Sequence, residues 1–209
     1  DLHRLIRRQR QMCIRDSNSL LGPYKGGVRF CLTTNEDNLI TLSLWKTLKC
    51  ALASLPFGGA KGVILINPEQ LTISELEKIS REYIAKLAAN IGPEQDILAA
   101  DLNTNAKVAE WMESEYSKIC QIPRPGVITC KPVNKGGIEG RDEATGLGAY
   151  YCITTLEKYN SWQPKKIKIA IQGFGECGHV VAKYLFDRGY NIVAVSDYYG
   201  GIYAADGLN

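Results

Sequence analysis

Apolar and polar residues along this chain follow two rhythms, one typical of strands and one typical of helices. Segment 22–30 begins with turn residues and continues as a short alternating run, which predicts a loop that enters a strand. Apolar residues at helical spacing then run from 39 to 52 and from 76 to 87. Segment 56–62 is rich in glycine and is predicted to be a loop between the first helix and a buried strand at 63–66.

Polar residues mark where the predicted helices begin. The residues suited to cap the first three helices are Asn35, Thr72 with Glu75 three positions later, and Thr104 or Asn105. Before the third helix, segment 96–100 predicts a short strand that ends at Asp101. The same kind of alternation continues to the end of the chain. The later elements are a proline- and glycine-rich stretch of loop and short strands at 123–140, a helix at 143–159, strands at 167–172 and 192–196, and a helix between them that ends near 187. Strands that alternate with helices predict an α/β fold.

Composition is that of an ordinary globular protein, with 209 residues, 45% of them hydrophobic and 22% charged. The net charge is +3 and no basic block stands out, so we expect no nucleic-acid or membrane partner. No secretory signal or membrane-spanning run is recognisable. The seven cysteines form no C-x-x-C pair, which predicts free thiols, no metal site and a cytoplasmic location.

Residues 1–17 form an arginine-rich segment with little amphipathic order. Three interpretations stay open: a basic presequence, a solvated arm, or foreign sequence over 11–17 joined to the gene during library construction. No function is predicted from this segment.

The segment 173–178 (GFGECG) matches the G-x-G-x-x-G pattern of dinucleotide-binding turns. A predicted strand precedes it, a predicted helix and a second strand follow it, and Asp197 comes directly after that strand. In this context Gly173 permits a tight turn, Gly175 lets the backbone approach a pyrophosphate, and Gly178 lets helix and strand pack closely. The helix N-terminus would face the phosphates, and Asp197 would accept hydrogen bonds from a ribose hydroxyl. NAD or NADP is therefore the predicted cofactor.

The alternative for this segment is a glycine-rich turn in an α/β domain that binds no nucleotide. Two strands cannot cover their own edges and apolar faces, and domains typically have about 100–150 residues. We therefore expect the chain to be a fragment whose missing part completes the second sheet.

Three lysines stand in unusual settings: Lys25 before two glycines, Lys49 on an apolar-patterned helix, and Lys61 between glycines. Two cations aimed into a cleft suit a substrate with two carboxylates. A third, desolvated and near other cations, would have a lowered pKa suited to acid–base chemistry. Asp101 ends a predicted strand, where an α/β cleft would place a catalytic carboxylate. The alternative is that Lys25 and Lys61 are solvated turn residues and Asp101 caps a helix.

Five motifs occur in the order and spacing of the glutamate dehydrogenase family: GPYKGGVRF, LKCALASLPFGGAKG, DLNTN, GRDEATG and GFGECG. The chain resembles that Glu/Leu/Phe/Val dehydrogenase family from Ser17 to Asn209 without a break. The resemblance implies an N-terminal α/β substrate domain at 18–142, followed at 143–209 by the start of a Rossmann-type, doubly wound dinucleotide-binding domain. It further implies a homo-hexamer that interconverts L-glutamate with 2-oxoglutarate and ammonium, using NAD or NADP.

The resemblance also implies roles for individual residues. Lys25 would hold the side-chain carboxylate of the substrate, with Gly26 and Gly27 in the same substrate site, and Lys49 would hold the α-carboxylate. Lys61 would activate water and stabilise a carbinolamine.

Two further roles complete the implied site. Asp101 would carry a proton to and from the substrate nitrogen, and Thr145 would hold the nicotinamide amide. Together with the glycine turn and Asp197, Thr145 would form the cofactor site.

Several positions depart from the family pattern. Cys31 replaces a common His, Ile138 a Ser, and Val63 the second Gly after the catalytic lysine. Lys46 replaces a usual Met or Gln and adds a cation near the substrate carboxylate. Glu176 replaces a usual Asn and puts a negative charge near the pyrophosphate in the cofactor site.

Two alternative functions stay open at this point. Sister enzymes of the family deaminate leucine, valine or phenylalanine, and they tend to have an apolar residue at the position of Lys25. A buried lysine without an anionic partner is costly, so Lys25 favours glutamate. The second alternative is a catalytically inactive subunit that binds dinucleotide without turnover.

Overall fold

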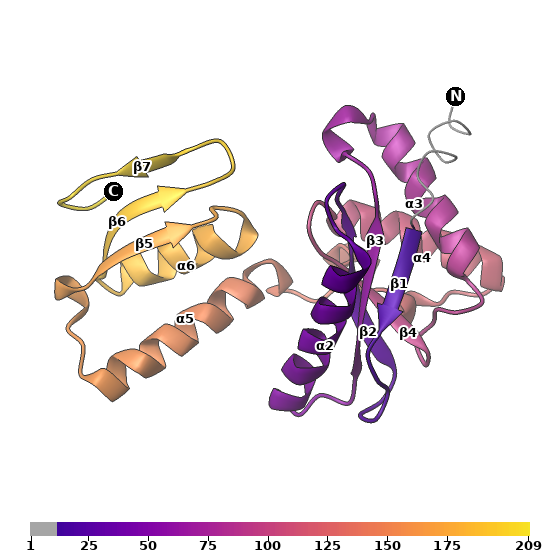
Figure 1. Ribbon diagram of the computed structural model, residues 1–209, viewed down its shortest axis with the longest axis horizontal. Helices are drawn as coiled ribbons and strands as arrows, with labels where there is room; N and C mark the ends of the chain where they lie inside the picture. Colours follow the sequence, from indigo (N-terminus) through magenta and orange to yellow (C-terminus); the bar gives the residue numbers. More distant parts are fainter. Residues whose placement is uncertain (1–11) are drawn as a thin grey trace. The chain divides into compact units, whose positions relative to one another are not determined.

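The computed structural model describes residues 12–209 of the chain. It divides into two compact units, Asp1–Ile138 and Glu139–Asn209 (Figure 1). The sequence predicts a boundary between 142 and 143, whereas helix α5 (Arg141–Asn160) begins inside the second unit. The presequence and solvated-arm interpretations fall largely on residues 1–11, which lie outside the described residues.

A four-stranded sheet forms the centre of the first unit. Its strands are β1 (Met12–Asp16), β2 (Tyr24–Phe30), β3 (Gly58–Ile64) and β4 (Asp96–Ala100), in the order β1-β3-β2-β4. β2 runs parallel to both β3 and β4, and β1 pairs antiparallel with β3 at the edge. The parallel strands therefore carry the crossover connections.

Helices cover both faces of this sheet (Figure 1). Helix α2 (Glu36–Leu52) packs on β3 from one side, and α3 (Ile73–Leu87) and α4 (Ala106–Cys120) pack together on the other. The side chains of Asn35, Thr72 and Asn105 cap these three helices, which confirms the predicted starts. Short 3₁₀ turns occur at Pro68–Gln70, Pro125–Val127 and Val133–Lys135.

The hydrophobic core of the first unit lies between the sheet and α3 with α4. Its largest fully buried side chains include Phe30, Ile64, Tyr83, Ile84, Leu98 and Met112. On the other face, α2 lies much closer to the sheet, because a Cβ atom on Gly59 would stand 2.1 Å from the carbonyl oxygen of Ser43. Small and polar residues such as Ser43 and Thr47 therefore face the sheet from α2.

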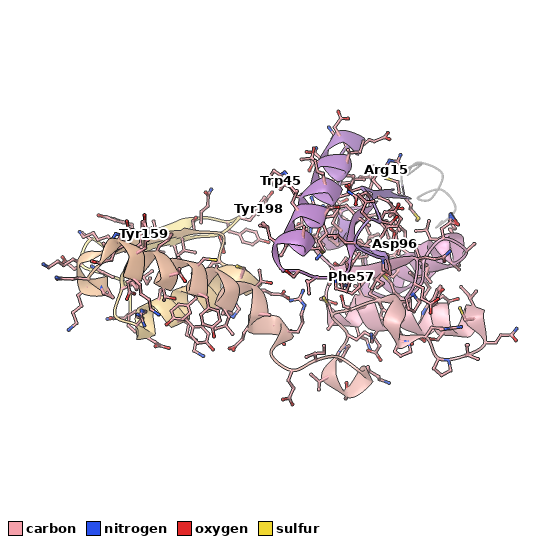
Figure 2. All side chains as sticks on the ribbon, turned by 90° about the horizontal axis from the view of Figure 1, so that it is seen from below. Arg15, Trp45, Phe57, Asp96, Tyr159 and Tyr198 are labelled. Carbon is pink, nitrogen blue, oxygen red and sulfur yellow. The ribbon has the colours of Figure 1, made fainter. Side chains whose placement is uncertain are left out.

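The apolar residues of α2 mostly point away from the sheet. Leu39 is fully buried, but Trp45, Leu48 and Leu52 are 63%, 54% and 89% exposed. Trp45 projects from the helix in Figure 2. The glycine-rich strand beneath α2 admits only small side chains, so the longer apolar ones are left on the outer surface of the helix.

Segment 56–62 was expected to be a loop, and this prediction is wrong from Gly58 onward. Strand β3 begins at Gly58 because the segment pairs with β1 on one side and β2 on the other. Its glycines are sites of close approach: Gly59 meets α2, and a Cβ on Gly62 would stand 2.6 Å from the hydroxyl of Tyr83. Lys61 therefore projects from the middle of a paired strand.

Segment 123–140 was expected to contain short strands as well as loop. The structure has two 3₁₀ turns there and a single β-bridge between Leu98 and Ile128. Pro125 stands at the start of the first turn. It has no N–H to donate to a sheet, and a turn does not need that hydrogen bond.

The second unit contains a three-stranded sheet. Its elements after α5 are a 3₁₀ turn (Pro164–Lys166), β5 (Lys168–Gln172), α6 (Glu176–Asp187), β6 (Asn191–Ser196) and β7 (Gly201–Tyr203). β5 and β6 are parallel, β7 pairs antiparallel with β6, and α5 packs on α6. The predicted α/β class, with a substrate-binding domain and the start of a Rossmann-type domain, is confirmed.

Candidate functional site

The alternation of β2 places three predicted or newly recognised site positions on one face of the first sheet. Lys25, Gly27 and Arg29 lie two residues apart, so they share a face. In the pairing of β2 with β3, Gly27 is the partner of Lys61. Paired residues on neighbouring strands point to the same side, so Lys61 joins this face.

Asp101 lies directly over Gly27. A Cβ atom added to Gly27 would stand 2.7 Å from the Cβ of Asp101, so only glycine leaves room for the carboxylate. Lys61 Nζ is 2.7 Å from Asp101 Oδ2, and Arg29 Nε donates to the same oxygen at 2.8 Å. The structure thus brings together Lys61 and Asp101, the two residues predicted to be catalytic.

The turn after β4 fixes the position of Asp101. The backbone N–H of Asp101 donates to Thr104 Oγ1 at 2.7 Å, and that hydroxyl donates to the carbonyl of Val28 at 2.8 Å. Asn103 adopts a φ of 58° and its side-chain amide donates to the carbonyl of Phe30. The DLNTN segment is therefore tied to the end of β2 before its last residue caps α4.

Burial and charge adjust the acid–base properties of this pair. The side chains of Lys61 and Asp101 are only 13% and 26% exposed. Burial lowers the pKa of Lys61; Asp101 opposes that effect, while Arg29 and Lys46 lower the pKa further. Burial raises the pKa of Asp101, but the hydrogen bonds and charges of Lys61 and Arg29 outweigh burial and hold it below its ordinary value. The arrangement provides an ionised carboxylate beside an ammonium group that loses its proton more readily than usual.

Three other residues predicted to bind substrate lie outside the ion pair of Lys61 and Asp101. Lys25 Nζ donates to Thr129 Oγ1 at 2.9 Å. Gly26 faces the opposite side of β2, where a Cβ would stand 1.8 Å from the carbonyl oxygen of Ala60, so packing accounts for this glycine. Lys49 is exposed on α2, and within residues 12–209 no hydrogen bond or ion pair ties its ammonium group to the others.

Two residues of this face were missed by the sequence reasoning. Arg29 lies inside the GPYKGGVRF motif, and its spacing of two from Gly27 is a signal that would have placed it beside Asp101. Thr129 comes from a loop 104 positions away from Lys25, and no local pattern indicates that contact. Lys46, recognised only as a departure from the family pattern, lies near enough to lower the pKa of Lys61.

The glycine turn of the second unit has the conformation that its sequence predicts. Gly173 has a φ of 91°, which favours glycine, and its N–H donates to the carbonyl of Ser196. A Cβ on Gly178 would stand 1.8 Å from the carbonyl oxygen of Gly173, whereas a Cβ on Gly175 would meet no atom within 4 Å. Tight helix–strand contact with open space above Gly175 is what a pyrophosphate-binding turn requires, so the residues present fit a dinucleotide.

Other predicted cofactor residues lie around this turn. Asp197 is exposed directly after β6, and its Oδ1 accepts from the N–H groups of Tyr199 and Gly200, which leaves Oδ2 for a ligand. Thr145 is exposed on α5 next to Gly146, where a Cβ would stand 3.0 Å from the carbonyl oxygen of Cys177 at the start of α6. Glu176, the first residue of α6, is exposed and stabilises the helix N-terminus with its charge.

Over residues 12–209, no group of three or more His, Cys, Asp or Glu side chains is placed to hold a metal ion. In the same range, no helix is both long and apolar enough to cross a membrane. The cysteines at 13, 31, 50, 120, 130, 152 and 177 are all free thiols.

Two family models together match most of the chain. The profile of the Glu/Leu/Phe/Val dehydrogenase dimerisation domain matches residues 12–118, and the Glutamate/Leucine/Phenylalanine/Valine dehydrogenase profile matches residues 136–209. This chain belongs to the Glu/Leu/Phe/Val dehydrogenase family. The family membership predicted from the five motifs is therefore confirmed.

Curated relatives within the Glu/Leu/Phe/Val dehydrogenase family carry both coenzyme specificities. An NADP-specific glutamate dehydrogenase of Synechocystis sp. is 48% identical over 90% of this chain and 44% of its own length. A catabolic NAD-specific glutamate dehydrogenase of Bacillus subtilis is 42% identical over 92% of this chain and 45% of its own length. The chain thus spans less than half the length of these relatives.

Solved structures in the Glu/Leu/Phe/Val dehydrogenase family share the fold. The hetero-hexameric glutamate dehydrogenase from Thermus thermophilus, in a leucine-bound form, matches 96% of this chain with a TM-score of 0.89 and 35% identity, over 53% of its own chain. The glutamate dehydrogenase from Peptoniphilus asaccharolyticus matches 96% of this chain with a TM-score of 0.77 and 33% identity, over 57% of its own chain.

Proposed function

We propose that this chain supplies the substrate-binding domain and the first part of the NAD(P)-binding domain of a glutamate dehydrogenase. The enzyme interconverts L-glutamate with 2-oxoglutarate and ammonium. The observation that carries the proposal is the ion pair of Lys61 with Asp101 on a glycine-floored face that also bears Lys25. A largely buried lysine–carboxylate pair with further cations suits acid–base chemistry on an anionic substrate.

Substrate recognition is assigned to the lysines of the first unit. Lys25 binds the side-chain carboxylate of glutamate through its Nζ, with Gly27 keeping the strand surface low beside it. Lys49 binds the α-carboxylate from α2. Leucine has no side-chain anion for Lys25 to bind, so placing leucine there would remove water from the ammonium group without adding an ion pair.

Proton transfer is assigned to Lys61 and Asp101. A bound NAD or NADP supplies the hydride acceptor for the substrate Cα, and the rest of the chemistry is acid–base. Lys61, as the neutral amine, takes a proton from water at Nζ while the water oxygen bonds to the Cα of the iminium, which gives a carbinolamine. Asp101, ionised in the free protein, first takes a proton from the α-ammonium group of glutamate and later returns it to the carbinolamine nitrogen. The C–N bond then breaks, and the hydroxyl proton passes to the departing ammonia, which gives ammonium and the ketone of 2-oxoglutarate.

Cofactor binding is assigned to the second unit. The N–H groups at the start of α6, beyond Gly173 and Gly175, hold the pyrophosphate. Asp197 accepts from a ribose hydroxyl, and Thr145 holds the nicotinamide amide. Glu176 contributes a negative charge beside the pyrophosphate and weakens its binding.

Assembly and location form part of the same proposal. We propose a homo-hexamer and a cytoplasmic location. The relative from Thermus thermophilus is a hetero-hexamer, so it supports the number of subunits and not their identity, and the free thiols support the location. Light scattering of a full-length enzyme that carries this chain is expected to give the mass of six subunits, and mass spectrometry of the dissociated assembly is expected to give a single subunit mass.

The test of function is a comparison of glutamate with leucine as substrates of a full-length enzyme that carries this chain. Glutamate is expected to give the higher kcat/KM. A Lys25→Met variant is expected to lose about 10- to 100-fold of kcat/KM for glutamate, because a hydrogen bond to a charged group contributes about 1.5–3 kcal/mol. Lys86→Met, on the exposed side of α3, is the matched control.

Two results would contradict the proposal. Leucine turnover above glutamate turnover would assign the chain to the sister enzymes. Coenzyme binding with no turnover of either amino acid would identify an inactive subunit.

A further inference from the structure

Both cations beside Asp101 contact the same carboxylate oxygen. Lys61 Nζ lies 2.7 Å and Arg29 Nε 2.8 Å from Oδ2. Within residues 12–209, no hydrogen bond or ion pair engages Oδ1. The two oxygens of this carboxylate are therefore unequal: one is held by protein and one is open to a ligand.

The setting of Arg29 suits it to hold the carboxylate of Asp101 in place. It projects from β2, which is paired on both sides by β3 and β4, and its side chain is only 18% exposed. Its Nε, the nitrogen nearest the backbone, makes the contact with Asp101, so few rotatable bonds separate the hydrogen bond from the strand. A planar guanidinium on a paired strand orients a carboxylate better than a flexible ammonium does.

We propose that Arg29 is a positioning residue for the deamination chemistry. It fixes Asp101 Oδ2 beside Lys61 and leaves Oδ1 as the oxygen that exchanges a proton with the substrate nitrogen. This inference rests on the proposed function, but its structural part, the orientation of Asp101 by Arg29, holds for the free protein.

The elements that neighbour this pair carry further charged groups. Lys61 is on β3, Lys25 and Arg29 are on β2, and Lys46 and Lys49 are on α2. Arg15 of β1 stands opposite Lys61 in the strand pairing and is itself paired with Glu36. Arg29 therefore lies among other cations, and the anion that it contacts is Asp101.

Removal of the Arg29 charge has a specific signature. Arg29→Gln removes a cation that stabilises the Asp101 anion, so the pKa of Asp101 rises. The same change removes a cation that repels the protonated Lys61, so the pKa of Lys61 also rises. A role limited to packing would lower stability and leave both titrations in place.

The first experiment titrates Asp101 and Lys61 in the 209-residue chain by NMR of the carboxyl carbon and the ammonium nitrogen. Arg29→Gln is expected to raise both midpoints. Arg29→Lys keeps the charge and is expected to restore both midpoints in large part. Arg124→Gln removes an exposed arginine elsewhere in the unit and is expected to move neither. Unchanged midpoints in Arg29→Gln, with the fold intact by circular dichroism, would overturn the proposal.

The second experiment measures oxidative deamination in a full-length enzyme that carries this chain. Arg29→Gln is expected to lose about 10- to 100-fold in kcat with a smaller change in KM, because a misplaced catalytic group costs about that much. Its rise of rate with pH is expected to move to higher pH. Arg29→Lys is expected to recover the pH profile but only part of kcat, since its ammonium group lacks the fixed geometry. An unchanged kcat in Arg29→Gln would overturn the positioning role.

The failure of this inference differs from a failure of the proposed function. If the unmodified enzyme turns over no glutamate while Arg29→Gln still shifts the Asp101 titration, the function is wrong and the orientation of Asp101 by Arg29 stands. If glutamate turnover is normal and Arg29→Gln alters neither titration nor kcat, the function stands and the role of Arg29 is wrong.

Discussion

The two candidate sites of this molecule are built in opposite ways. The charged cluster of the first unit, defined here as Arg29, Lys61 and Asp101, consists of side chains that touch through short ion pairs above a glycine floor. The glycine turn of the second unit, residues 173–178, presents bare backbone at its three glycines, Gly173, Gly175 and Gly178. The first site depends on charged side chains, and the second depends on glycines that leave its backbone accessible.

This difference decides what each site tolerates. In the charged cluster, each member shifts the protonation of the others, so a change of charge acts on chemistry while the backbone stays in place. In the glycine turn, a change as small as one methyl group meets backbone at Gly178. Catalysis and cofactor binding should therefore be separable by mutation.

The largest effect is expected from Lys61→Ala in a full-length enzyme that carries this chain. Loss of the general base should reduce kcat by about 10²- to 10⁴-fold. Coenzyme affinity, measured by fluorescence titration, should stay unchanged because the glycine turn lies in the other unit. Lys86→Met, at an exposed position of α3, serves as the control. Near-normal turnover of Lys61→Ala would remove Lys61 from the mechanism.

The reverse separation is expected from Gly178→Ala. Its Cβ would stand 1.8 Å from the carbonyl oxygen of Gly173, and overpacking of this kind costs about 1–3 kcal/mol. Coenzyme binding should be lost or strongly weakened, while binding of 2-oxoglutarate to the first unit, measured by calorimetry, should persist. Gly148→Ala on α5 meets no atom within 4 Å and is the matched control. Equal coenzyme affinity in both variants would contradict the assigned turn.

A smaller effect is expected from Lys46→Met, which restores a residue usual in the family. Oxidative deamination needs the neutral form of Lys61, so its rate rises as pH increases through the pKa of Lys61. That pKa lies below its ordinary value of 10.5, in part because of Lys46. Loss of Lys46 raises the pKa of Lys61 and moves the rise of kcat/KM to higher pH, with a loss of about 1.4- to 5-fold near neutral pH, since a partly exposed charge pair contributes about 0.2–1 kcal/mol. A pH profile that coincides with that of the unmodified enzyme would show that Lys46 does not act on Lys61.

The smallest effect on function is expected from Thr72→Ala, at the start of α3 and outside both sites. Thr72 and Glu75 form a capping box at the start of α3, with the Glu75 N–H donating to Thr72 Oγ1 at 3.3 Å. Loss of the cap should lower the free energy of unfolding by about 1 kcal/mol, measured by urea denaturation, and leave kcat unchanged. Thr72→Ser should keep most of that stability. A change in kcat without a change in stability would be incompatible with this role.

Local signals in the sequence predicted much of this structure. The caps at Asn35 and Thr72, the strand at 96–100 and the turn at 173–178 each depend on residues close in sequence, and each was found. Such signals work because capping and tight turns are determined by short-range hydrogen bonds and backbone angles.

What the sequence did not predict depends on contacts between distant segments. The glycines at 58–62 suggest a loop until strands on both sides and a helix above are known to approach them. The outward direction of Trp45 follows from the same packing. The contact of Lys25 with Thr129 spans 104 positions and has no local signal, and Arg29 joins Asp101 only once β2 and the turn after β4 meet.

The central claim is that lysines of the first unit bind a dicarboxylate beside the Lys61–Asp101 pair. The most direct measurement is a crystal structure of a full-length enzyme that carries this chain, bound to 2-oxoglutarate. We expect the distal carboxylate at Lys25 Nζ, the keto carbon beside Lys61 Nζ, and Asp101 Oδ1 turned toward that carbon. A 2-oxoglutarate bound away from this face, with Lys25 and Lys61 contacting only water, would contradict the account.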